Sequence, residues 1–534
     1  MRRLLIGDRQ SLMITFLISS LITAVCSQTW TTSEPGQLAQ QDPVLEQDGY
    51  RNTEASSLAT IGNIDDIAKD WETPEFAIVY SGRQQGYIEP CGCTGLENQY
   101  GGILRRHTAI QTLQQRGWPM IKVDAGDQVK RFGQQPMIKL EKTYQALLEI
   151  MDYDVIALGA GELKIPSIDL AQLLVNVPQP STPFVSANIE VVHPDLSQRF
   201  KVLEKGGKRI GVTTILGDES IDELGNTEGV SMQQMRIALT EVLPEMMAQN
   251  CDAFVLVAGT SIDNCRDLAQ QFPQFDLIIT TDCAGDPTLE PQFISTPRGN
   301  LPLVQVGIKS MYLGLIGFYV AESGWKIRYE RIPLDARFED SEPVKQVFIS
   351  YQNELRRLWE GGRFADIKPR RHPSGNQFVG SEACADCHGV EYEIWEQGNS
   401  GNGGPHKHAT ASLVEPNQRS WVQRHFDPEC VSCHMTGWDP QGYFPFESGY
   451  FDHTKDQHLY DNGCENCHGP GSGHIQAERH QADNPNVLEK FRAQVRVTLE
   501  EARQNACMEC HDLDNSPDFL KEGGFDRYWP EIEH

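Results

Sequence analysis

Short apolar runs recur between residues 76 and 320, and amphipathic stretches separate several of them. Most of the runs are followed by Gly, Asp or Ser, which is typical of buried strands that end in turns. Residues 136–151 instead place Leu140, Tyr144, Leu147 and Met151 on one face of a predicted helix. The runs include "FAIVYSG", "MIKVDAGD", "DVIALGAGE", "RIGVTTIL", "AFVLVAGT", "DLIITTD" and "LGLIGFYV". This alternation predicts an α/β domain with layered sheets over residues 73–335.

A helix and a linker are predicted after this domain, over residues 336–376. Apolar side chains recur at helical spacing from Val344 to Trp359, and Ser341 is suited to cap the helix. Residues 361–376 then mix Gly, Pro and Arg, as linkers do. The composition changes beyond this point, because residues 377–534 hold eight of the 14 cysteines and 12 of the 15 histidines.

The first 72 residues lack the pattern of a packed domain. Residues 1–26 combine Arg2 and Arg3 with an apolar run at 12–25, which is too short to span a membrane and predicts a signal peptide. Cys26 ends this run, so a lipid anchor at Cys26, ordinary cleavage and an uncleaved anchor are all open. Residues 27–72 are polar and predict a disordered tether. We therefore expect an exported protein, either periplasmic or membrane-anchored and facing the periplasm.

The charge balance excludes one class of partner. The chain has 46 Lys plus Arg against 74 Asp plus Glu, a net charge of -28. Such a chain repels phosphate backbones and anionic lipid headgroups, so no nucleic-acid partner is expected. A basic protein partner is compatible with this charge, although an acidic surface also simply keeps a protein soluble.

Four copies of one motif carry the chemistry of the C-terminal part. They are "CADCH", "CVSCH", "CENCH" and "CMECH", and each has two cysteines on one turn followed directly by histidine. This spacing lets two thiols add to the vinyl groups of a haem while the next imidazole reaches the iron. Structural zinc or disulfides are the alternative. The predicted haem-binding cysteines are Cys384, Cys387, Cys430, Cys433, Cys464, Cys467, Cys507 and Cys510, with His388, His434, His468 and His511 as iron ligands.

Four covalently attached haem c groups imply a mainly α, haem-packed domain over residues 377–534, because side chains alone are too few for its core. A second histidine on each iron would give a centre that cycles electrons without binding substrate. Nine further histidines lie from His372 onwards. Among them His408, which opens a predicted helix, and His474, in a Gly-rich turn, are the predicted ligands. The other histidines are expected at the surface or near propionates.

The segments "SEACADCHGVEYEIW", "HATASL", "PECVSCH" and "CENCHGPGSGH" resemble the tetrahaem cytochrome c554 family. The resemblance covers about 155 residues. It implies a periplasmic electron carrier with closely stacked haems and a redox protein as partner. One haem in that family can lack a distal histidine.

Residues 76–330 resemble the metal-dependent half of the 5'-nucleotidase family, a branch of the metallophosphoesterases. "GGILRR", "VDAGD", "YDVIALGAGEL" and "PFVSANIE" follow the order of that family, which implies a layered β-sandwich flanked by helices. Asp127 matches the bridging aspartate of its paired metals. "YSGRQ", with Arg83, replaces Asp-x-His, and Ala160 and Gly161 replace the ligands of Gly-Asn-His-Glu. The resemblance therefore implies the fold, while most ligands for two catalytic metals are missing.

Three cysteines follow strands at the same edge of the predicted sheets. Cys91 and Cys93 lie in "EPCGC" after the first strand, and Cys283 lies in "TTDCAG". They are candidate catalytic residues, either as a redox pair or as thiolate ligands of a soft metal. The "EPCGC" loop resembles that of a nucleotidase-like family whose second cysteine can be selenocysteine, which favours redox chemistry at Cys93. Plain disulfides among these three, Cys251 and Cys265 are the structural alternative.

Together these features predict an exported multihaem cytochrome that transfers electrons and carries a nucleotidase-like domain. Two other functions are open. One is an oxidoreductase acting on a small sulfur or nitrogen compound, at the thiols or at an open haem. The other is an active metal-dependent phosphohydrolase.

Overall fold

The computed structural model describes residues 63–89, 100–131, 133–175, 182–322, 324–362, 367–415, 422–480, 483–512, 515–516 and 519–534. These residues belong to one compact unit. The predicted signal peptide, Cys26, Cys91 and Cys93 lie outside the described residues. Within the described ranges, no helix combines the length and apolar character needed to cross a membrane.

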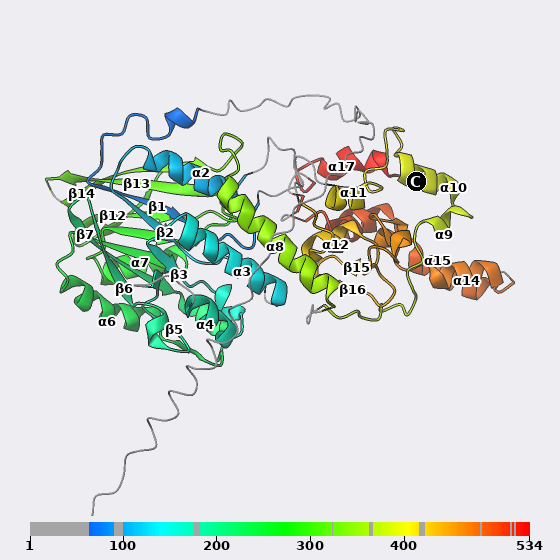
Figure 1. The fold of residues 1–534 in the computed structure, drawn as a ribbon, viewed down its shortest axis with the longest axis horizontal. Helices are drawn as coiled ribbons and strands as arrows, with labels where there is room; N and C mark the ends of the chain where they lie inside the picture. The colour runs from blue at the N-terminus through cyan, green and yellow to red at the C-terminus, as the bar shows by residue number, and fades with distance from the viewer. Residues whose placement is uncertain are drawn as a thin grey trace, which may run out of the picture. The chain divides into compact units, whose positions relative to one another are not determined.

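Two six-stranded sheets form the centre of the N-terminal domain (Figure 1). The first has the order β14-β13-β1-β2-β3-β4 and the second β11-β12-β10-β9-β7-β6. Strands β1 to β4 run parallel, and so do β12, β10, β9 and β7. The first sheet consists of β1 (Phe76–Ser81), β2 (Met120–Asp124), β3 (Val155–Ala157), β4 (Phe184–Val185), β13 (Tyr312–Ala321) and β14 (Gly324–Pro333). The second consists of β6 (Phe200–Lys205), β7 (Lys208–Leu216), β9 (Ala253–Gly259), β10 (Leu277–Thr280), β11 (Gln292–Thr296) and β12 (Gly299–Gln305).

The two sheets pack face to face on a shared apolar core. Ile78 of β1 and Val123 of β2 belong to the same buried cluster as Val212 of β7 and Ile279 of β10. All six positions of β1 are buried, because a central strand with both faces covered has no solvent side. This is why the first apolar run of the sequence has no polar alternation.

Helices cover the outer faces of both sheets (Figure 1). On the first sheet, Ile110 and Tyr144 of the covering helices cluster with Val79 of β1. On the second, Leu239 and Leu268 cluster with Ile278 of β10. The helices of this domain are α2 (Ile103–Gln114), α3 (Gln134–Gln145), α4 (Ser167–Val175), α5 (Asp218–Leu224), α6 (Met235–Met247) and α7 (Ile262–Gln271). The result is a layered α/β sandwich, so the predicted fold class is confirmed for this domain.

The ordered fold begins before residue 73, the start that the sequence predicts for this domain. A short helical turn at Ile64–Asp66 is capped by Asn63. Ile67 and Ala68 behind it are buried, and the Ala68 amide donates to Glu330 Oε2 at 2.8 Å. The polar composition of 27–72 hides this because the apolar side chains that anchor the turn are few and are confined to the last residues of the segment. A small ladder, β5 (Ile189–Val191) with β8 (Val230–Met232), completes the domain.

Helix α8 (Glu342–Glu360) joins the two domains and confirms the helix predicted from Ser341. The Ser341 side chain accepts from the Val344 amide and caps the helix. Phe348 and Leu355 are buried in the cluster that also covers the first sheet. Near its end, Trp359 stacks on Trp438 of the C-terminal domain with ring centres 5.9 Å apart. The helix therefore packs on both domains.

The C-terminal domain consists of short helices and one two-stranded ladder, β15 (Trp438–Asp439) with β16 (Phe444–Pro445) (Figure 1). Helices α9, α10, α15 and α16 contain no buried residue. This agrees with the expectation that side chains alone do not fill its core. The helices are α9 (Glu382–Ala385), α10 (Gly389–Gln397), α11 (Ala409–Val414), α12 (Pro428–His434), α13 (Cys464–His468), α14 (Ser472–His480), α15 (Pro485–Val495), α16 (Leu499–Glu501) and α17 (Gly524–Tyr528).

Candidate functional site

Each of the four cysteine–histidine motifs folds as a tight helical turn. The second motif ends α12, whose first turn is capped by the Asp427 side chain. The third motif is the whole of α13. In the first and fourth motifs the histidine amide donates to the carbonyl of the first cysteine, His388 to Cys384 and His511 to Cys507, both at 2.9 Å. This turn presents both thiols and the imidazole on one side, as haem attachment requires.

Hydrogen bonds orient three of the four motif imidazoles. Nδ1 of His434 lies 2.9 Å from the Ala409 carbonyl oxygen, and Nδ1 of His468 lies 2.7 Å from that of Val495. Nδ1 of His511 lies 3.0 Å from Ser516 Oγ. Burial lowers the pKa of all three rings, which favours the neutral form. Because a carbonyl oxygen only accepts, Nδ1 is the protonated nitrogen of His434 and His468, and Nε2 of these two rings remains for a metal.

Three motif histidines face a second histidine ring. The ring centres are 6.2 Å apart for His388 and His474, 6.2 Å for His511 and His406, and 5.8 Å for His468 and His534. Two imidazoles on one metal need about 6 Å, from two bonds of about 2 Å each and about 1 Å from each nitrogen to its ring centre. These spacings fit an iron between each pair, and the donor set fits haem.

His406 and His534 were among the histidines that the sequence analysis expected at the surface or near propionates. No local signal distinguishes them, because the pairing depends on tertiary structure. His408, the predicted ligand in "HATASL", is the N-cap of α11 and its side chain is exposed. His474, the other predicted ligand, lies opposite His388.

The histidine of the second motif differs from the others. Among the described residues, no ring contact joins His434 to another histidine, although all 15 histidines of the chain are described. His425 and His453 form a separate pair with ring centres 4.5 Å apart. That spacing is too short for a metal between the two rings. The His425 ring also lies against Phe426, with ring centres 3.8 Å apart.

Cysteines of different motifs contact one another. Cys384 and Cys464 lie close enough to shift each other's pKa, and so do Cys433 and Cys510. Cys467 in turn lies close enough to Cys507 for an electrostatic effect on its pKa. Haems attached at these cysteines would have their thioether edges close together, the first beside the third and the second beside the fourth.

The carboxylates at the edge of the first sheet accept hydrogen bonds from backbone amides or pair with an arginine. Asp127 Oδ1 accepts from the Gly161 amide at 2.9 Å, and Glu162 accepts from the Gly159 and Asp127 amides. Asp124 forms a fully buried ion pair with Arg106 at 3.1 Å. Burial raises the pKa of Asp127, and burial together with the Asp127 charge raises that of Glu162 to about 8.

No histidine side chain fits at position 161. A Cβ there would collide with the Val129 carbonyl oxygen. Among the described residues, no group of three His, Cys, Asp or Glu side chains is arranged to hold a metal ion. The Arg83 guanidinium lies at this edge and donates to the Cys283 carbonyl oxygen at 2.5 Å.

Cys283 lies in the loop after β10 and is buried. Its thiol donates to the Gly285 carbonyl oxygen at 3.1 Å, and burial raises its pKa. Because Cys91 and Cys93 lie outside the described residues, the predicted cluster of these two with Cys283 stays a prediction. Cys251, Cys265 and Cys283 are free thiols, so no disulfide joins these three.

These features define a C-terminal domain with four Cys-x-x-Cys-His motifs joined to a layered α/β domain. Residues 383–469 match the family described as "Cytochrome c554 and c-prime". Cytochrome c-554 from Nitrosomonas europaea is 29% identical over 104 residues, which cover 18% of this chain and 39% of the relative. The chain thus spans less than half the length of that relative. The resemblance of the C-terminal region to the cytochrome c554 family is confirmed.

Three solved structures are similar to the chain at low identity. The 5'-nucleotidase precursor from Thermus thermophilus gives a TM-score of 0.46 at 16% identity, covering 64% of this chain and 66% of that one. The NAD nucleotidase from Haemophilus influenzae gives 0.47 at 13%, covering 64% and 68%. The sulfate thiohydrolase SoxB from Thermus thermophilus gives 0.44 at 15%, covering 53% and 61%.

Proposed function

We propose that this chain is an exported electron-transfer protein with four covalently attached haem c groups. The contacts between cysteines of different motifs carry the proposal. Cys384 with Cys464, Cys433 with Cys510, and Cys467 near Cys507 would place neighbouring porphyrin edges against one another. A haem held by two histidines exchanges electrons without binding substrate.

We propose His474, His406 and His534 as the second ligands of the first, fourth and third haems. The facing ring spacings of 5.8–6.2 Å support this assignment. His406 thereby takes the role that the sequence suggests for His408. The iron at His434 would keep an open position, because among the described residues no ring contact joins His434 to a second histidine, although His434 lies near enough to lower the pKa of His406 and His511.

The N-terminal domain acts in this proposal as the support of the second haem motif, in place of its ancestral hydrolase role. The Asp427 carboxylate, at the start of α12, accepts from Gln352 Nε2 at 2.8 Å and pairs with the Tyr351 hydroxyl at 3.2 Å. Lys139 of α3 pairs with Glu429, directly before Cys430. Backbone amides that donate to Asp127 and Glu162, together with Arg83, occupy the edge of the first sheet, where the metals of a phosphohydrolase would lie.

We also propose Cys91 and Cys93 as a thiol redox site. Glu89, which precedes them in the sequence, forms an ion pair with Arg424 of the C-terminal domain. The pKa of Arg424 responds to Glu89 and to Cys430, so this pair lies beside the second motif. Cys93→Ser should abolish thiol-dependent haem reduction and leave haem content unchanged. An unaltered reduction rate would contradict a redox role for Cys93.

A reductive titration of the purified protein tests the electron-transfer proposal. We expect the Soret and α-band changes to require four electrons per chain, in overlapping steps. A requirement for two electrons or fewer would contradict it. With a net charge of -28, the protein should also accept electrons faster from a basic than from an acidic redox partner, and the difference should shrink with added salt.

The open position proposed at His434 favours a second candidate function, an oxidoreductase acting on a small nitrogen or sulfur compound. Carbon monoxide should then bind one reduced haem per chain. The absence of a spectral change with carbon monoxide would exclude this second function and leave electron transfer as the only proposed function.

A further inference from the structure

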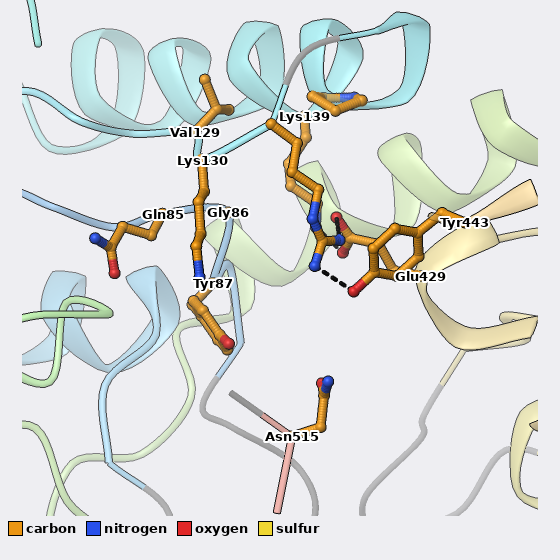
Figure 2. Close-up of a pocket in the computed structure, with 11 residues that line it drawn as sticks. Gln85, Gly86, Tyr87, Val129, Lys130, Lys139, Glu429, Tyr443 and Asn515 are labelled. Atoms are coloured by element: carbon orange, nitrogen blue, oxygen red, sulfur yellow. Dashed lines mark hydrogen bonds and ion pairs between the residues drawn. The ribbon is translucent and has the colours of Figure 1, made fainter. Parts of the chain in front are cut away.

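Two haem motifs contain or adjoin a glutamate whose carboxylate another part of the chain holds. Glu429, directly before Cys430 of the second motif, pairs with Lys139 in a pocket that both domains line (Figure 2). Glu465 lies between the two cysteines of the third motif and is only 3% exposed. Within the described part of the chain, no lysine or arginine forms an ion pair with Glu465. The two carboxylates thus differ, because a cation compensates the charge of Glu429 and none pairs with that of Glu465.

Backbone amides hold the Glu465 carboxylate from two directions. The Val379 amide donates to both oxygens, at 3.0 and 2.9 Å, and the Gly380 amide donates to Oε2 at 2.7 Å. The Gly471 amide donates to Oε1 at 2.7 Å. An amide N–H only donates, so the ionised carboxylate satisfies all of these bonds. Burial raises the pKa of Glu465, and the three amides oppose that effect.

These bonds connect the two segments that supply the proposed ligands of the first haem. Gly380 directly precedes Ser381, the N-cap of α9 in the first motif. Gly471 directly precedes α14, which carries His474. His388 of the first motif faces His474 with ring centres 6.2 Å apart. One carboxylate therefore fixes the starts of both segments, which limits how the two imidazole rings can turn.

The Glu465 charge reaches the attachment cysteines of two haems. The neighbouring Cys464 and burial raise the pKa of Cys384, and the Glu465 charge raises it further. The same charge acts on Cys464, although the neighbouring Cys384 keeps the pKa of Cys464 low. Cys384 would attach the first haem and Cys464 the third. A negative charge at these two edges stabilises oxidised iron, the more positive state, and burial strengthens the effect because little water screens it.

We propose that Glu465 is a positioning residue that lowers the reduction potentials of the first and third haems. Its charge would favour the oxidised state of both irons, and its bonds to backbone amides would set the orientation of His388 and His474. A neutral side chain could connect the same segments without the cost of burying a charge, so the charge itself indicates a role in tuning the haems. The inference rests on the proposed function, since it requires haems at both motifs.

Redox titration of the haem-loaded full chain, followed by electron paramagnetic resonance, tests the proposal. His474→Ala and His534→Ala each replace one proposed ligand, so they assign the low-spin signals of the first and third haems. We expect Glu465→Gln to raise both potentials, so that the ratio of reduced to oxidised haem at a fixed potential rises about tenfold, which is about 59 mV for one electron. The line shape of the first-haem signal should also change, because glutamine offers one acceptor oxygen in place of two.

Two further variants separate the buried charge from other causes. Asp386→Asn is the matched control, because Asp386 also lies between the cysteines of a motif, but its side chain is 70% exposed and pairs with Arg479. It should change the ratio of reduced to oxidised haem by less than about threefold, since water and salt screen an exposed charge. Glu465→Asp keeps the buried charge, so the ratio for both haems should stay within about threefold of the wild-type value.

Three results would overturn the proposal. The first is a Glu465→Gln variant that binds four haems and has both potentials unchanged. The second is a shift of the same size in Asp386→Asn, which would indicate a general loss of charge. The third is the full rise in Glu465→Asp, which would assign the low potentials to side-chain length and which decides the question even where Glu465→Gln fails to bind four haems. The haem content and low-spin signals of the wild-type protein report the proposed function separately, so its failure is distinguishable from failure of this inference.

Discussion

Replacing Lys139 with methionine tests whether the N-terminal domain holds the second haem motif. Lys139 Nζ lies 2.5 Å from Glu429 Oε2, and the Lys139 side chain is 7% exposed. Methionine keeps most of the apolar length and removes the charge. The Glu429 carboxylate would then retain Arg131 at 3.7 Å as its ion-pair partner.

The burial of Lys139 sets the expected loss in the free energy of unfolding. Removing one partner of a fully buried ion pair costs about 3–5 kcal/mol, because the other charge stays buried without compensation. The Glu429 side chain is 31% exposed, so water offsets part of the penalty. We expect Lys139→Met to lower the free energy of unfolding by about 2–3 kcal/mol.

The stability lost in Lys139→Met should depend on pH. Burial alone would raise the pKa of Glu429, but the Lys139 and Arg131 cations hold it below its usual value. The folded pKa is thus lower than the unfolded one, so the stabilisation is complete above the ordinary Glu value of 4.5 and is lost as the pH falls through the folded pKa. The difference between wild type and variant should therefore persist at pH 7 and shrink in acid.

Denaturant unfolding of the haem-loaded protein, followed at the Soret band, measures this effect. Lys326→Met serves as the surface control, with an expected change within about 0.5 kcal/mol. Lys139→Met combined with Glu429→Gln should recover part of the loss, because the Glu429 charge that Lys139 compensates is then removed as well. A Lys139→Met variant as stable as the control at pH 7 would refute the reasoning.

Three further predictions address the ligands and the edge of the first sheet. His406→Ala should convert one low-spin haem into a high-spin haem, whereas His408→Ala should leave the electron paramagnetic resonance spectrum unchanged; the reverse result would restore His408 as the ligand. Glu162 has a folded pKa raised to about 8, so the free energy of unfolding should fall as the pH rises from 4.5 to about 8. Glu162→Gln should flatten this slope in urea unfolding, and an unchanged slope would assign it to other groups. The protein should not hydrolyse phosphate esters with added Mn²⁺, Mg²⁺ or Zn²⁺, and turnover at ordinary rates of about 1 to 1,000 per second would contradict the loss of the metal site.

Local patterns were sufficient to predict the main elements. The run from Phe76 to Gly82 predicts a strand, and β1 forms there with all six positions buried. The apolar spacing at 136–151 predicts a helix, and α3 with the turn Ala146–Ile150 forms it. The Ser341 cap predicts the start of α8. In each case the signal lies within a few residues of the element that it specifies.

The partners of the motif histidines could not be predicted in the same way. His406 lies 105 positions before His511, and His534 lies 66 positions after His468. Such pairs form only when separate helices pack, and no local spacing encodes them. The contacts of Lys139 with Glu429 have the same origin, because they join residues 290 positions apart. The fold of the cytochrome domain therefore determines its ligands in a way that motif spacing does not show.

Haem and iron quantification, combined with electron paramagnetic resonance of the oxidised protein, tests the central claim most directly. The account predicts four covalently bound haems per chain, three of them low-spin with two histidine ligands and one high-spin at His434. Fewer than three haems, or zinc in place of iron, would contradict the cytochrome assignment. Four low-spin haems would contradict the open position at His434.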